Sequence, residues 1–143
     1  MSSYSSYREL KCWKDSMTLV ESVFRMTASF PKEEQYGFVS QLRRSALSVP
    51  SNIAEGQGRD SKKEFLRFLG IARGSLQELE TQLILAHRLA WLDSSTFEMM
   101  STMISEIRRM LNGLCKYLRT GQASNTTATL NQQQTTKNQK LTP

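Results

Sequence analysis

The sequence has 143 residues, of which 38% are hydrophobic and 22% charged, and its 19 Lys and Arg residues outnumber its 13 Asp and Glu residues to give a net charge of +6. This composition is typical of one soluble globular domain with a tail, and it excludes collagen-like, fibrous and disulfide-scaffold proteins. No apolar run approaches the roughly 20 residues that cross a bilayer, and the N-terminus lacks the apolar core of a signal peptide, so we expect a cytoplasmic protein with no membrane partner.

The first predicted helix is marked by apolar residues in alternating steps of three and four. This spacing places them on one face of a helix, which ends before Pro31. The predicted core positions are Leu10, Trp13, Met17, Val20, Phe24 and Thr27.

A second helical pattern runs from Phe38 to Ile53, and the Gly56-Gln57-Gly58 segment marks its end. Pro50 lies inside this pattern. Because proline removes a backbone donor and its ring pushes the preceding turn away, we expect a kink or a short break at this point.

Two further helices follow, each with a sequence signal at its start. Ser61-Lys62-Lys63-Glu64 is a capping box, and the apolar positions after it keep one face as far as Ala90. Asp93 is the expected N-cap of the fourth helix. Four amphipathic helices with short connections predict an all-α fold, an antiparallel up-down-up-down four-helix bundle over residues 1–119. Residues 120–143 are rich in Thr, Asn and Gln and predict a disordered C-terminal tail.

The outer face of the third helix is predicted to be basic. On a helical wheel, the side opposite the core carries Lys63, Arg67, Arg73 and Arg88 and no acidic residue. Further cations are expected near one end of the bundle: Arg43, Arg44, Arg59 and Lys62. Such a surface suits a phosphate backbone. The alternative interpretation is a set of solvated cations, several of them paired with Glu55, Asp60 or Glu64.

A pair of glycines on the same helix suggests a second use of this face. Gly70 and Gly74 are four residues apart, and Leu66 and Ile84 also lie away from the core. Small residues at this spacing allow another helix to approach closely, so these four residues are the predicted oligomer interface. Both uses are compatible only if the oligomer leaves the arginines open.

The sequence predicts no catalytic site, metal site or cofactor. His87 has no carboxylate three residues before it, as the Glu-x-x-His motif of di-iron bundles requires, and a solvated or cap-bonded role is favoured. Glu78 and Glu80 are two residues apart and face different sides of the helix, so they do not form a carboxylate pair.

Other polar and sulfur-containing residues are given structural roles. Cys12 and Cys115 lack metal-ligand spacing and are expected to be free, reduced thiols. Four polar residues near core-facing positions are expected to form a buried hydrogen-bond network around Pro50. They are Asn52, Glu55, Ser75 and Glu78.

Longer motifs carry a family resemblance. They are Gln41–Ala46, Val49–Gly56 followed by Gly58-Arg59, Phe65, Phe68-Leu69, Ile71–Ser75 and Glu78–Leu83, with Tyr7–Leu10, Trp13, Phe30-Pro31, Glu34 and Gly37 nearer the N-terminus. In these motifs the sequence resembles the four-helix-bundle proteins of the 23S rRNA intervening-sequence family, over about residues 7–118. One departure is Ala90-Trp91, where Gly-Tyr is common, and another is Gln57, where an aromatic residue is frequent.

The resemblance implies a ring-like homopentamer without an established catalytic role. Proteins similar in fold serve as accessory subunits of retroelement reverse transcriptases, where they bind nucleic acid and the transcriptase. The basic residues that match the family motif are Arg43, Arg44, Arg59 and Arg73.

Taken together, the residues and the resemblance predict a non-enzymatic, oligomeric bundle that binds nucleic acid, RNA in preference to DNA. The predicted contacts are Arg43, Arg44, Arg59, Lys63, Arg67 and Arg73. The alternative is a protein-interaction adaptor or accessory subunit, for example of a reverse transcriptase, that makes no direct contact with nucleic acid.

Overall fold

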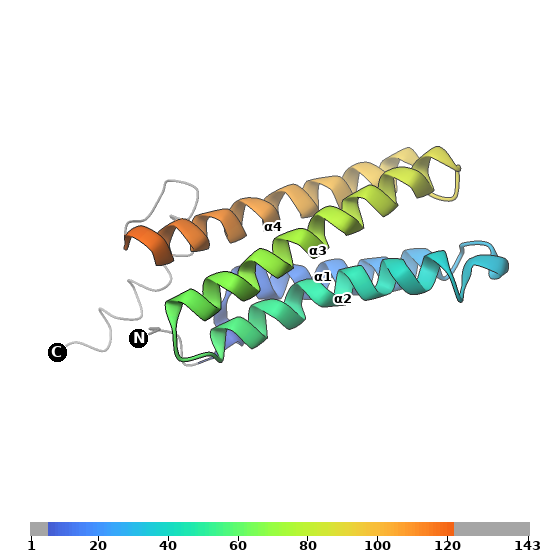
Figure 1. Ribbon diagram of the computed structural model, residues 1–143. Helices are drawn as coiled ribbons and strands as arrows, with labels where there is room; N and C mark the ends of the chain where they lie inside the picture. Colours follow the sequence, from blue (N-terminus) through green and yellow to red (C-terminus); the bar gives the residue numbers. More distant parts are fainter. Residues whose placement is uncertain (1–5, 122–143) are drawn as a thin grey trace.

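The computed structural model describes residues 6–121, and in this range the chain forms helices and no strand. The elements are η1 (Tyr7–Glu9), α1 (Lys11–Thr27), η2 (Lys32–Glu34), α2 (Phe38–Gln57), α3 (Lys62–Arg88) and α4 (Ser94–Thr120). Figure 1 shows each of the four long helices running back against the one before it. The predicted all-α, four-helix fold is confirmed. Thr120, placed in the tail by the sequence, belongs to α4, and the predicted disorder of residues 122–143 lies outside the described residues.

The apolar faces of the four helices meet in one core. Each helix packs against its two neighbours around the bundle: α2 lies between α1 and α3, and α4 lies between α3 and α1. Fully buried side chains from every helix fill the centre, among them Leu19, Leu42, Leu76, Ile104 and Leu111. Each such side chain contributes about 1.5–3 kcal/mol by leaving water.

The buried face of α1 is rotated from the predicted one. Its buried residues are Cys12, Ser16, Leu19, Val20, Val23 and Thr27. Phe24, predicted to be in the core, is 40% exposed. Ser16 donates a hydrogen bond to the carbonyl of Cys12, which satisfies its hydroxyl inside the core. Small residues such as Cys12 and Ser16 contribute little to a hydrophobic pattern. The predicted core face was therefore centred on larger residues such as Phe24 and was rotated from the observed one.

The second helix is continuous through its proline. α2 keeps helical geometry from Phe38 to Gln57, and Pro50 is buried within it, so the predicted break is absent. Near the end of α2, Gly56 lies so close to α3 that a Cβ built on it would be 2.7 Å from the Cβ of Phe68. This contact fixes how closely the two helices approach.

The turns that lead into α3 and α4 reproduce two predicted caps, and the second of them corrects one core assignment. Ser61 accepts a hydrogen bond from the backbone N–H of Glu64, and Asp93 accepts one from that of Thr96. Ala90, predicted on the core face of the third helix, instead follows its end and is exposed. The N–H groups of Ala90 and Trp91 donate to the carbonyls of His87 and Ala86, which is the Schellman arrangement.

This turn holds Ala90 at a φ of 60°, in the left-handed region where glycine is favoured. We expect Ala90→Gly to raise the free energy of unfolding by about 0.5–1 kcal/mol, because the alanine Cβ is strained there. Urea denaturation followed by circular dichroism measures the difference. The control is Ala28→Gly, at the exposed C-cap of α1, where φ is −60°. An equal rise in both variants would contradict the interpretation.

No helix in the described range is both long enough and apolar enough to cross a membrane.

Candidate nucleic-acid interface

Arg43 is a structural residue that holds α1 and α2 together. Its Nε donates to the hydroxyl of Thr27 at 3.0 Å, and its Nη2 donates to the carbonyl of Phe24 at 3.3 Å. The guanidinium also lies 4.7 Å from the centre of the Phe24 ring. The last carbonyls of a helix lack partners within the helix, so Arg43 caps the end of α1. A side chain held in this way is poorly placed to bind a phosphate.

The substitution Arg43→Ala is therefore expected to destabilise the fold by about 2 kcal/mol, since hydrogen bonds from a charged donor and the cation–π contact are lost together. The neighbouring Arg44→Ala is the matched control, because Arg44 is exposed and forms no ion pair within residues 6–121. Thermal and urea denaturation of the two variants gives the comparison. Equal stability would refute the capping role of Arg43.

Two other predicted contacts, Arg59 and Arg67, are paired with carboxylates. Arg59 binds Glu55 and Arg67 binds Glu64, each at 2.7 Å. The hydrogen bond from Arg67 holds the pKa of Glu64 below its usual value. Both guanidinium groups also lie over the ring of Phe68, at 5.0 Å for Arg59 and 4.5 Å for Arg67. The alternative interpretation, cations paired with Glu55 or Glu64, is therefore confirmed at Arg59 and Arg67.

The predicted cations do not gather at one end of the bundle. Arg43 and Arg44 lie beside the C-terminal end of α1, whereas Arg59 lies in the turn between α2 and α3 at the opposite end. At 1.5 Å per residue, the two positions are about 24 Å apart along α2. The prediction of one cluster is wrong in this respect. Lys63 is exposed and close to Arg59 in the chain, and it forms no ion pair in the described part of the molecule.

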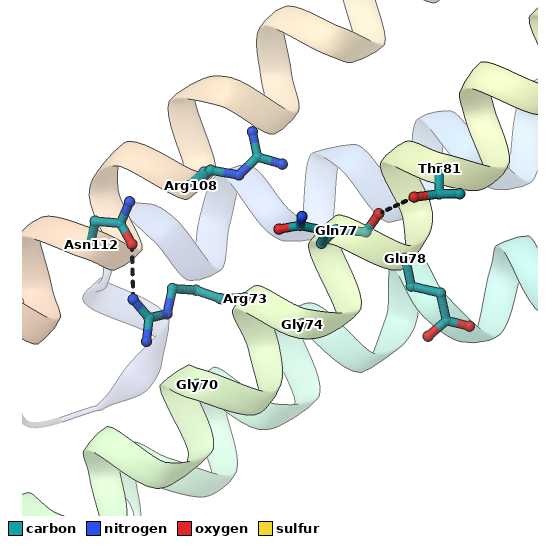
Figure 2. A pocket seen from close by; sticks show the side chains of 8 residues that line it. All are labelled: Gly70, Arg73, Gly74, Gln77, Glu78, Thr81, Arg108 and Asn112. Carbon is teal, nitrogen blue, oxygen red and sulfur yellow. Dashed lines mark hydrogen bonds between the residues drawn. The ribbon is translucent and has the colours of Figure 1, made fainter.

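Arg73 differs from the other predicted contacts because its fixed partner is neutral. Its Nη1 donates to the side-chain oxygen of Asn112 on α4 at 3.1 Å. Figure 2 shows the two side chains reaching toward each other between α3 and α4. An amide oxygen positions the guanidinium but leaves its charge uncompensated. Arg73 is also half-buried, so its position is more restricted than that of an exposed arginine.

Arg73 lines a groove of about 610 Å³ between α3 and α4. The lining residues are Gly70, Arg73, Gly74, Gln77, Glu78 and Thr81 of α3 with Arg108 and Asn112 of α4. Arg108 donates to Glu80 across the two helices at 2.8 Å. The glycines have no side chains, and a Cβ built on Gly70 or Gly74 meets nothing within 4 Å. The groove is thus open along its α3 side, and the side chains that line it are polar or charged.

The four predicted oligomer-interface residues have different environments. Gly70 and Gly74 lie in the groove, among polar side chains. Leu66 is half-buried and packs against the bundle's own core. Ile84 is 39% exposed, further along α3. The structure therefore brings the two glycines together with Arg73, and it does not join the four residues in one apolar surface.

The C-terminal half of α4 carries cations that sequence reasoning missed. Glu106 is the last acidic residue of the chain, whereas Arg108, Arg109, Lys116 and Arg119 follow it within α4. Arg109, Lys116 and Arg119 are exposed, and none forms an ion pair within residues 6–121. The absence of acids after Glu106 was the signal that could have identified them. We call these three residues the α4 basic cluster.

The residues considered for chemistry have structural partners. His87 shares a hydrogen bond of 3.2 Å with Ser94 and stacks on Phe97, so it joins the ends of α3 and α4. Within the described residues, no three His, Cys, Asp or Glu side chains are grouped as metal ligands. Cys12 and Cys115 are buried free thiols, and burial raises the pKa of Cys12 to about 12. The Cys12 thiol is therefore protonated at neutral pH.

The predicted polar network forms with half of its expected members. Ser75 shares a hydrogen bond of 2.7 Å with Ser48, and Asn52 donates to the carbonyl and the hydroxyl of Ser48. The Ser48–Ser75 bond joins α2 to α3, and Ser48 and Asn52 lie two residues before and two residues after Pro50. Glu55 and Glu78 are exposed and take no part in the network.

Known proteins match this architecture. A solved structure from Bacteroides thetaiotaomicron, described as a protein of unknown function from the S23 ribosomal protein family, has a TM-score of 0.68 and 23% identity. The match covers 73% of this chain and 95% of that one, and at this identity it shows the fold alone. No curated protein matches the sequence. The family model described as 23S rRNA-intervening sequence protein matches residues 8–113, which include most of the four helices. Because this match covers well over half of the chain and agrees with the motifs and the fold, the protein belongs to the 23S rRNA-intervening sequence protein family.

Proposed function

We propose that the protein is a non-enzymatic, oligomeric bundle that binds nucleic acid, RNA in preference to DNA. The observation that carries this proposal is the set of uncompensated cations on α3 and α4. Lys63 and the α4 basic cluster are exposed without ion pairs in the described range, and Arg73 is held by a neutral amide. Cations that keep their charge release counterions when they bind phosphates, which favours binding to a polyanion.

The positions of these cations support the same proposal. The N-terminal half of α3 and the C-terminal half of α4 lie at the same end of the bundle, because successive helices run in opposite directions (Figure 1). A hydrogen bond from Arg73 to Asn112 joins the two segments, and one from Arg108 to Glu80 joins the same two helices further along α3. Oligomerisation as a homopentamer, which the family resemblance implies, would repeat this surface around a ring and raise the avidity of weak contacts.

A second candidate is an adaptor that binds another protein, such as a reverse transcriptase. The observation that favours it is the exposure of apolar side chains near the C-terminal end of α3. Leu85 is 45% exposed and Leu89 is 47% exposed, and their positions in the chain differ by four, about one helical turn. Exposed apolar pairs at this spacing are typical of helical protein interfaces, although single exposed leucines are common on any protein.

The test is the nucleic-acid content of the protein isolated at low salt. Binding to RNA predicts an absorbance ratio at 260 and 280 nm above that of the protein alone, which falls after treatment with RNase and not after DNase. A ratio equal to that of the protein alone, together with a protein partner that stays bound after nuclease treatment, would contradict RNA binding and support the adaptor. A ratio that falls only with DNase would overturn the preference for RNA.

A further inference from the structure

The groove between α3 and α4 combines a fixed positive charge with an open floor. Gly70 and Gly74 lie on either side of Arg73 in the chain, and space is open at both glycine positions. From the opposite wall, Asn112 holds the guanidinium of Arg73 by one hydrogen bond, which leaves the other N–H groups of that arginine to a ligand (Figure 2). The groove therefore presents a pre-positioned anion contact beside a surface without side chains.

The charge of Arg73 has no acidic partner, although the two cations and two acids in and beside the groove balance. Glu78 is the acidic residue that lines the groove, and Figure 2 shows its carboxylate pointing away from Arg73 and Asn112. Its carboxylate accepts a hydrogen bond of 3.4 Å from Gln82. Arg108, on the α4 wall, is compensated by Glu80. Arg73 is therefore the uncompensated charge of the groove, in contrast with Arg59 and Arg67 at the end of the bundle.

We infer that this groove seats the sugar-phosphate backbone of an RNA strand, with Arg73 as the phosphate contact. This inference rests on the proposed function, RNA binding, and adds that the bound strand lies between α3 and α4. Phosphate contacts position a nucleic acid without reading its sequence, and the amide and hydroxyl groups of Gln77, Thr81 and Asn112 are suited to ribose hydroxyl groups. The missing side chains at Gly70 and Gly74 allow the backbone to lie close to the helix.

A helix from a second copy is the other possible occupant, and the lining disfavours it. Burying Arg73, Gln77 and Glu78 against a helix would remove polar and charged groups from water. Leu66, which would flank such a contact, already packs against the bundle's core. The guanidinium of Arg73, which has a neutral partner, thus favours an anionic group in the groove.

The test separates the shape of the groove from its charge. Gly74→Leu fills the groove and keeps every charge, whereas Arg73→Gln removes the charge and keeps most of the side chain. The control is Arg88→Gln, an exposed cation at the other end of the same helix with no ion pair in the described residues. The probe is a fluorescently labelled single-stranded RNA of 20 mixed nucleotides, and the readout is anisotropy as a function of salt.

We expect Gly74→Leu to weaken RNA binding at least tenfold and to reduce the salt slope by up to about 0.7, because the strand is kept away from Arg73. Arg73→Gln is expected to weaken it about as much and to reduce the slope of log affinity against log salt by about 0.7, the contribution of one contact with a single strand. Arg88→Gln should bind within about twofold of the original protein. Circular dichroism checks that each variant is folded, and Gly74→Ala provides a second, smaller variant if the leucine is not tolerated.

Three results would overturn the inference in distinguishable ways. If Gly74→Leu and Arg73→Gln bind RNA as the original protein does, the groove is not the seat of the strand, although the proposed function stands. If Gly74→Leu changes the mass of the particle measured by light scattering and leaves RNA affinity unchanged, a second copy occupies the groove. If the original protein itself does not bind RNA, the proposed function fails along with the inference.

Discussion

The substitution Gly56→Ala is expected to lower the free energy of unfolding by about 3 kcal/mol, because there is no room for a methyl group between α2 and α3. A Cβ at this position would lie 2.7 Å from the Cβ of Phe68 and 3.3 Å from the carbonyl oxygen of Phe65. Neither contact is with the flexible end of a side chain, so the two helices would have to move apart. Urea denaturation followed by circular dichroism measures the loss.

The matched control is Gly70→Ala, because a Cβ at Gly70 meets nothing within 4 Å. Both positions are helical, so both variants gain about 1 kcal/mol of helix propensity from the replacement of glycine. Gly56→Ala should therefore lower the free energy of unfolding and Gly70→Ala should raise it, and the two variants should differ by several kcal/mol. Similar stabilities would show that α2 and α3 are not in close contact at Gly56.

Replacement of the α4 basic cluster is expected to cause the largest loss of RNA binding. The triple variant Arg109→Gln, Lys116→Gln and Arg119→Gln should bind single-stranded RNA about 10- to 100-fold more weakly at 100 mM salt. Its salt slope should also decrease by about 2, since each contact with a single strand contributes about 0.7. Stability should change little, because all three residues are exposed and form no ion pair in the described range.

The control for this variant changes the net charge equally at the opposite end of the bundle. Arg25, Lys32 and Arg88 are exposed cations near the C-terminal ends of α1 and α3, and of these Arg25 is paired with Glu21 at 3.6 Å. Their replacement by Gln should leave the RNA affinity within a few-fold of the original. If both triple variants lose affinity equally, binding depends on net charge alone, and the α4 basic cluster is not a binding surface.

Most of the fold could be predicted because it depends on local signals. The apolar spacing marks four helices, and the Ser61 and Asp93 caps mark the starts of α3 and α4. The position of α1 around its own axis could not be predicted in the same way. A wide apolar face allows several rotations, and the choice depends on how small residues such as Ser16 fit against neighbouring helices.

The candidate site could be predicted only in part, because a single helix does not reveal its tertiary partners. Lys63 and Arg73 were correctly placed away from the core centre of α3. On a helical wheel Glu64 lies outside the basic face. Residues three apart are nevertheless neighbours on a helix, so Glu64 pairs with Arg67. The cap formed by Arg43 on α1 depends on two helices packed together. The groove likewise requires Arg108 and Asn112 of α4, which no pattern in α3 could indicate.

The dependence of RNA affinity on salt tests the central claim most directly. The full-length protein is titrated with labelled single-stranded RNA at several salt concentrations from 50 to 200 mM. Binding through the uncompensated cations of α3 and α4 predicts a linear fall of log affinity against log salt, with a slope of about −3 for four or five phosphate contacts. Affinity that is absent at 50 mM salt, or that does not change across the range, would contradict the claim.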